Sequence, residues 1–186
     1  MRVLRPGLWL LVVVSLGAFV GVKAGKAQAP ARPAAQTAAG ARPTANLAQV
    51  MRGILFPNVN IIYAAQNEDP AKIKPADDPN TSVNPLTGSW GGWAAVENSG
   101  LAISEASRLL TVPGRLCSNG KPVPLQNADW GKFVQGLRDA GLVAYKAGQA
   151  KSMDALGDAS DKVTTACQNC HDVYRDKGGP EARCVK

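Results

Sequence analysis

The chain has 186 residues, with 21 Lys or Arg against 14 Asp or Glu, and a formal net charge of +7. Cations in the first 29 residues (Arg2, Arg5, Lys23, Lys26) account for much of this charge, and the chain without that segment carries +3. So mild a charge, with no basic run interleaved with aromatic residues, argues against a nucleic-acid partner. The length beyond the amino terminus suits one domain with one core.

The amino terminus is typical of a secretory signal peptide. Arg2 and Arg5 precede an apolar run over residues 8–22, and small residues follow at Ala24 and at Ala29. This order predicts a signal peptide over residues 1–29, cut after Ala24 or Ala29. The run is short for a membrane span of about 20 residues, although an uncleaved anchor stays open. Association with a membrane is expected only in that case.

The next segment, residues 30–45, is rich in Ala and Pro and has no aromatic residue. It predicts a flexible tether between the export signal and a domain over residues 46–186. Apolar residues then recur at steps of three and four along the first part of the domain, which predicts an amphipathic helix (Leu47, Val50, Met51, Ile54, Asn58, Ile61, Ile62). Pro57 cannot donate to the Gly53 carbonyl, so it should kink or interrupt this helix.

Three more helices are expected further along the chain. A loop rich in Pro and Asp over residues 67–88 precedes a second helix over about residues 92–111. Asn127 is typical of the cap of a third helix. The fourth runs from about Ser152 to Lys177, and its predicted buried stripe includes two cysteines (Leu156, Ala159, Val163, Cys167, Cys170, Tyr174). Four helices in a small domain predict an all-α, antiparallel four-helix bundle.

The last of these helices carries the sequence Cys167-Gln168-Asn169-Cys170-His171. Two thiols about one helical turn apart, followed at once by an imidazole, form the attachment signature of a c-type haem. Each thiol adds to a vinyl group and leaves a thioether. His171, the only histidine, lies where it would serve as the proximal iron ligand. The pattern predicts one covalently bound haem c on the last helix.

Cys-x-x-Cys has two other common uses. A thioredoxin-like site should follow a strand, and nothing upstream of Cys167 resembles one. A zinc site needs two more ligands, and the remaining cysteines, Cys117 and Cys184, are single and far apart. Haem attachment also agrees with the export signal, because bacteria attach haem c outside the cytoplasmic membrane. A periplasmic location is therefore expected.

A four-helix domain with CxxCH on its last helix resembles the cytochrome c′ family and its low-spin relatives. The closest local similarity is the segment CQNCHDVYR, residues 167–175, and the helical pattern extends it to about residues 46–178. The resemblance implies that Met51 on the first helix is a sixth iron ligand, since relatives with Met there are six-coordinate and those with an apolar residue are five-coordinate. Family members usually carry an arginine one turn earlier, near a haem propionate. This chain has Leu47 there.

Two further predictions concern side chains near the haem. Met51 as adaptable core filler is the alternative to Met51 as ligand. Arg175 follows His171 by one helical turn, so it could bond to a propionate or limit access to the iron; the alternative is a solvated arginine at the helix end. Cys117 and Cys184 remain after haem attachment and suggest a disulfide in an exported protein, with free thiols or pairing to another molecule as the alternative.

The sequence thus predicts a one-electron carrier without substrate chemistry of its own, which passes electrons to redox partner proteins. The alternative is a five-coordinate haem protein that binds nitric oxide or carbon monoxide. A subunit of a larger respiratory complex is a third reading, and a homodimer is left open. A hydrolase or transferase is disfavoured because no second histidine could act as a base and no GxSxG, HExxH or P-loop is present.

Overall fold

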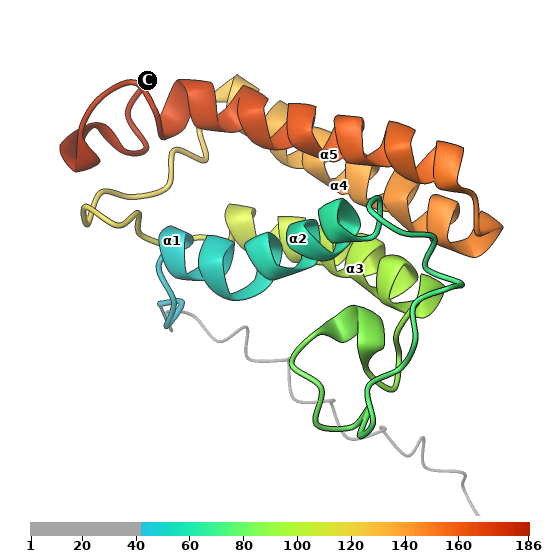
Figure 1. Ribbon diagram of the computed structural model, residues 1–186. Coiled ribbons are helices and arrows are strands. Elements are labelled where there is room, and N and C mark those ends of the chain that lie inside the picture. The colour runs from blue at the N-terminus through green and yellow to red at the C-terminus, as the bar shows by residue number, and fades with distance from the viewer. Residues whose placement is uncertain (1–41) are drawn as a thin grey trace, which may run out of the picture. The chain divides into compact units, whose positions relative to one another are not determined.

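The computed structural model describes residues 42–186, so the predicted signal peptide and most of the predicted tether lie outside the described residues. Four helical rods make up this part of the chain (Figure 1). The bounds are as follows: α1 Leu47–Val50, η1 Met51–Leu55 and α2 Phe56–Ala64 in the first rod; α3 Trp93–Ala106 and η3 Ser107–Thr111 in the second; α4 Ala128–Ala150; α5 Met153–Tyr174; and the short 3₁₀ turns η2 Pro85–Thr87 and η4 Pro180–Ala182. No strand occurs in residues 42–186, and the expected all-α class is confirmed there.

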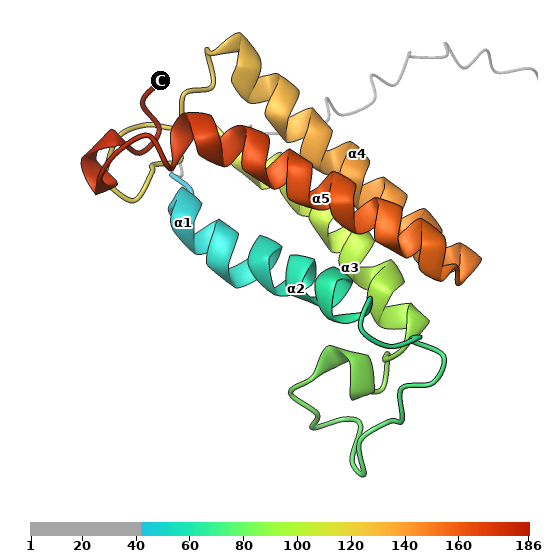
Figure 2. The ribbon, with the colours of Figure 1, turned by 45° about the horizontal axis from the view of Figure 1, so that its top comes forward.

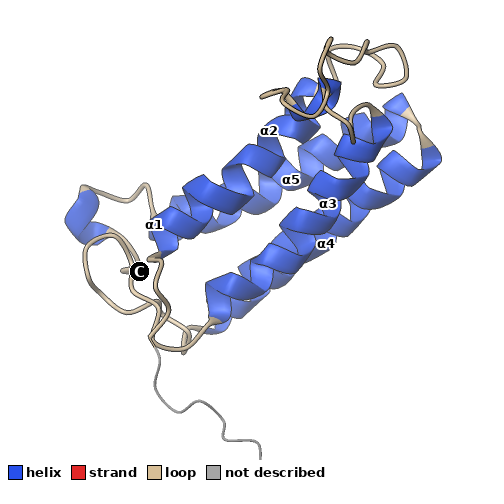
Figure 3. Cartoon of the chain, turned by 90° about the horizontal axis from the view of Figure 1, so that it is seen from below, coloured by secondary structure: helices blue, strands red, loops and turns tan. Residues whose placement is uncertain are grey.

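The rods pack as a bundle with one core. Helix α3 lies along α4, α4 lies along α5, and α2 contacts both α3 and α5, as two further views show (Figure 2; Figure 3). The inner faces meet in a single apolar cluster whose fully buried members come from every rod (Ile62, Val96, Ile103, Trp130, Ala144, Leu156, Val163). Within residues 42–186, no helix has the length and apolar character needed to span a membrane.

The α3–α4 contact is close because glycines lie at the crossing. A Cβ at Gly141 would lie 2.6 Å from the backbone nitrogen of Ser104, and one at Gly100 would collide with the backbone of Tyr145. Larger side chains would push the two backbones apart and open the core. These two helices are therefore held at short range, and α4 presents a fixed surface on which α5 packs.

Pro57 does not break the first rod; it changes its hydrogen bonding. Residues Met51–Leu55 form a π-helical turn, in which the Phe56 amide donates to the Met51 carbonyl five residues back. The missing Pro57 N–H falls just after this wider turn, where the α-helical ladder is already interrupted. The sequence correctly located the disturbance, but the structure accommodates it within a continuous helix.

The π turn also shifts which residues of the first rod are buried. The buried side chains are Val50, Leu55, Val59 and Ile62, whereas Ile54, predicted to face the core, is 37% exposed. The step from Val50 to Leu55 is five residues, one more than an α-helix would give. The prediction that Ile54 faces the core was wrong because it assumed α-helical spacing along the whole first rod.

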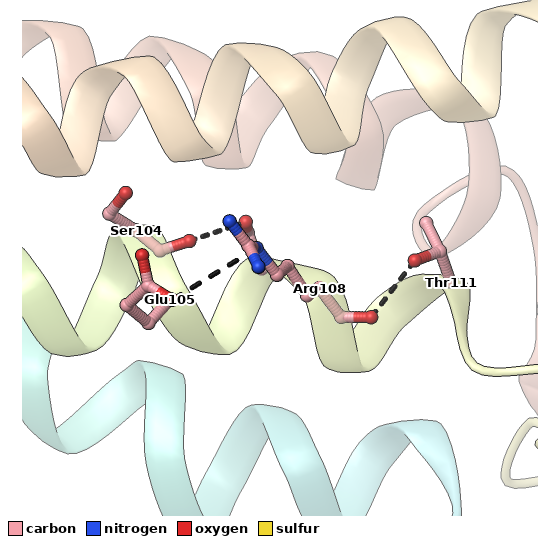
Figure 4. A network of polar contacts seen from close by, with 5 residues as sticks. Ser104, Glu105, Arg108 and Thr111 are labelled. Atoms are coloured by element: carbon pink, nitrogen blue, oxygen red, sulfur yellow. Dashed lines mark hydrogen bonds and ion pairs between the residues drawn. The ribbon is translucent and has the colours of Figure 1, made fainter. Parts of the chain in front are cut away.

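The second rod ends near Thr111 as predicted, but its last turn tightens from α-helix to the 3₁₀ turn η3. Figure 4 shows the polar contacts of this turn, where the Thr111 hydroxyl donates to the Arg108 carbonyl over 2.9 Å and Arg108 pairs with Glu105 at 4.0 Å. The buried Ser107 hydroxyl donates to the Ser104 carbonyl over 2.6 Å. The two hydroxyl contacts satisfy carbonyls near the end of the helix, where partners within the helix run out.

Candidate functional site

A cavity of about 670 Å³ lies between the first rod and the pair α4–α5. This volume is within the range of small-molecule and cofactor sites in proteins. The first rod contributes one wall (Leu47, Ala48, Met51, Arg52, Leu55, Phe56, Val59, Tyr63). The opposite wall comes from α4 (Trp130, Phe133, Val134, Leu137) and α5 (Ala166, Cys167, Cys170, His171, Tyr174). Trp130 and Leu137 belong to the buried core and are also part of the cavity wall.

Cys167, Cys170 and His171 lie together on the α5 wall of this cavity. Ser152 fixes the start of that helix, because its hydroxyl accepts from the Ala155 amide over 3.2 Å. The two cysteines are half-buried rather than fully buried with the rest of the predicted stripe, and neither is in a disulfide. Their side chains therefore border the cavity, where they are accessible to a bound molecule.

Burial sets the protonation of these three side chains. It raises the pKa of the Cys170 thiol to about 12, helped by the neighbouring Cys167, whose own pKa burial also raises. Burial, and then the charge of Arg175, lowers the pKa of His171. The cysteines are thus neutral thiols, poor thiolate ligands for a metal, while His171 is a neutral imidazole able to donate a nitrogen lone pair.

Met51 is on the opposite wall of the same cavity, half-buried at the first position of the π turn. Single π turns inside α-helices are rare and occur frequently at functional sites. The structure therefore brings the predicted proximal residue His171 and the predicted distal residue Met51 to one cavity from different rods. Met153 does not line this cavity; it begins α5 at the α4–α5 turn.

Arg175 is exposed and lies directly after the last residue of α5. Helix α5 ends at Tyr174 rather than near Lys177, and Arg175 leaves the helical conformation with φ −120° and ψ −45°. Its guanidinium makes a two-point contact with the Asp176 carboxylate, at 2.7 and 2.8 Å. Both residues still line the cavity, so Arg175 is near the site, but its charge is already paired.

Cys117 and Cys184 are joined by a disulfide, with their Cα atoms 6.5 Å apart. Closing 67 residues of chain contributes about 4 kcal/mol by restricting the unfolded state. The bridge ties the carboxyl-terminal tail, residues 175–186, to the loop between η3 and α4, and both cysteines form part of the cavity wall. The tail also brings Arg183 to the cavity, and the first rod brings Arg52. Sequence reasoning missed both arginines.

Tyr174 anchors the end of the motif-bearing helix against α4. Its ring packs edge-on against Trp130, with centroids 5.0 Å apart, and its hydroxyl donates to Asp129 over 2.6 Å. Asn127, predicted to cap α4 through its side chain, instead donates to the Tyr174 hydroxyl over 2.9 Å and makes no capping bond. Lys186 pairs with Asp129 at 2.7 Å, so the chain end joins the same cluster.

This cluster predicts a loss of stability in acid. The contacts from Lys186 and then Tyr174 lower the pKa of Asp129 from 3.8 to about 2. A carboxylate with a lowered folded-state pKa stabilises the protein above its ordinary pKa, and this contribution disappears as pH falls from about 4 to about 2. Asp129→Asn should be less stable than the wild type at pH 7, and the difference should shrink across that window in urea denaturation.

The control is Asp158→Asn, an exposed residue of α5, which should denature like the wild type at every pH. A constant difference between Asp129→Asn and the wild type from pH 7 to pH 2 would contradict the assignment of Asp129.

The donor set of the cavity fits a haem c. Two neutral thiols one turn apart can add to two vinyl groups, a neutral imidazole follows, and a thioether lies on the facing wall. Among residues 42–186, no group of three or more His, Cys, Asp and Glu side chains is arranged to hold a metal ion. Comparison with known protein families, curated proteins and solved structures gave no match for this chain.

Proposed function

We propose that this chain is a periplasmic monohaem c-type cytochrome of the cytochrome c′ class that carries single electrons between partner proteins. The observation that carries the proposal is the CxxCH sequence on the wall of a cofactor-sized cavity, with a methionine on the facing wall. The proposal includes an antiparallel order of the four rods and export directed by residues 1–29.

Each residue of the site has a distinct role in this proposal. Cys167 and Cys170 would hold the group by thioether bonds, His171 would bind the iron from the proximal side, and Met51 would bind it from the distal side. Bound haem supplies the one-electron couple between ferric and ferrous iron. The surrounding aromatic and aliphatic side chains exclude water and hold the ligands in place, so that little rearrangement accompanies a change of charge.

A route for electrons requires an approach for a partner protein. Phe56 is 62% exposed and borders the cavity, as does the exposed Arg52 one turn earlier on the first rod. An exposed aromatic residue beside a charge suits the small, transient interfaces of redox proteins. This surface supports electron transfer at the cavity edge without any catalytic group, and we propose no enzymatic activity.

The test uses the full-length chain produced in a bacterium that matures c-type cytochromes. The purified protein should keep its haem through denaturing electrophoresis and through extraction with acidified acetone, and its ferrous spectrum should have the sharp bands of a c-type haem. Haem that passes into the organic phase, or a protein without haem, would rule the proposal out.

A further inference from the structure

The carboxyl-terminal tail folds back onto the cavity at a defined place. The Cys184 amide donates to the Tyr174 carbonyl over 2.9 Å, while the Cys184 side chain is joined to Cys117. Asn119 Nδ2 donates to the Arg183 carbonyl over 2.9 Å and to the Glu181 carbonyl over 3.1 Å. The backbone on both sides of Arg183 is therefore fixed to the loop that carries Cys117.

Arg183 itself has an unused hydrogen-bond donor. Its side chain lines the cavity, and its Nε is buried with no hydrogen-bond partner among residues 42–186. The other two arginines of the cavity wall differ, because Arg175 is paired with Asp176 and Arg52 is exposed. Buried polar groups normally have partners, and a guanidinium matches a carboxylate best. The unused donor therefore indicates that an anionic group of a bound ligand lies within the cavity.

We propose that Arg183, held against the cavity by the Cys117–Cys184 disulfide, binds a propionate carboxylate of the haem and raises the reduction potential. This inference rests on the proposed function. An unpaired propionate would stabilise the more positive ferric state, and a fixed guanidinium beside it opposes that effect.

The experiment measures the midpoint potential of the haem-loaded, full-length protein by spectroelectrochemical titration at pH 7 and constant ionic strength. Arg183→Gln should lower the ferrous-to-ferric equilibrium ratio about tenfold, which is about 59 mV for one electron. Arg183→Lys keeps the charge without the planar fork and should shift the ratio less. The matched control is Arg138→Gln: Arg138 also has a buried Nε without a partner, but it lies on α4 and does not line the cavity.

Equal potentials for Arg183→Gln and Arg138→Gln would overturn the inference. The role of the disulfide is tested in the Cys117→Ser/Cys184→Ser protein, whose potential should already be low and should change little on adding Arg183→Gln. If the shift in potential caused by Arg183→Gln is as large without the disulfide as with it, the bridge does not position Arg183.

If Arg183→Gln fails to take up haem, Asn119→Ala decides the question. This change frees the Arg183 backbone and should also lower the potential; an unchanged potential would overturn the inference.

These outcomes separate the inference from the proposed function. If the wild-type protein carries no covalent haem, both the proposed function and the inference about Arg183 are contradicted. A wild-type protein with covalent haem, and the same potential in the wild type and in every Arg183 variant, ends only the inference about Arg183.

Discussion

Replacing Cys167 and Cys170 together by alanine should abolish covalent haem, leaving a protein with no haem stain after denaturing electrophoresis. The expected effect is complete because the two thioethers are the only covalent links that the proposal assigns. Single replacements should leave one thioether and a reduced yield. The spectrum of such a product should shift, since one vinyl group remains unsaturated.

The matched control uses the other two cysteines of the chain. The Cys117→Ser/Cys184→Ser protein loses the same number of cysteines, here as one disulfide, but keeps the attachment motif, so it should still carry covalent haem at lower stability. The loss should be about 4 kcal/mol in urea denaturation. A haem stain that persists without Cys167 and Cys170, or that disappears in the control alone, would show that attachment has been assigned to the wrong pair.

The parts of the fold that sequence predicted are those fixed by local chemistry. The start of α5 was predicted from Ser152, which is followed by apolar residues at helical spacing. The CxxCH spacing predicted that both thiols and His171 share one side of that helix, and all three line one wall of the cavity. The all-helical class was predicted from the same spacing, with apolar residues at steps of three and four. These predictions depend on neighbours within about one turn, and such neighbours can be read directly from the chain.

The parts that the sequence did not predict depend on contacts between distant segments. The register of the first rod changed at Leu55 because a π turn inserts one residue, and no single-residue preference marks that turn. The sequence suggested the Cys117–Cys184 disulfide, and the structure contains it. The place of Arg183 at the cavity also depends on long-range contacts, such as that of the Asn119 side chain with the Arg183 carbonyl, which no local pattern reveals. The end of α5 at Tyr174 depends likewise on the contacts of that side chain with Trp130 and Asp129.

Met51→Leu should convert a six-coordinate, low-spin protein into a five-coordinate, high-spin one. Leucine fills a volume similar to that of methionine but has no lone pair, so the bundle should remain folded while the iron loses a ligand. The ferric wild type should have the weak sulfur-to-iron charge-transfer band at the red end of its spectrum, and the variant should not. The reduction potential should fall, since a thioether ligand favours ferrous iron.

Binding of carbon monoxide then distinguishes the electron carrier from a gas-binding protein. The ferrous wild type should bind carbon monoxide slowly or not at all, and Met51→Leu should bind it readily because the distal position is open. Met153→Leu is the control, since Met153 lies at the start of α5 and outside the cavity wall, and it should behave like the wild type. A wild type that is already high-spin and binds carbon monoxide readily would make Met51 a packing residue. The cavity would then be better explained as the site of a five-coordinate haem that binds nitric oxide or carbon monoxide, with the π turn at Met51–Leu55 in its distal wall.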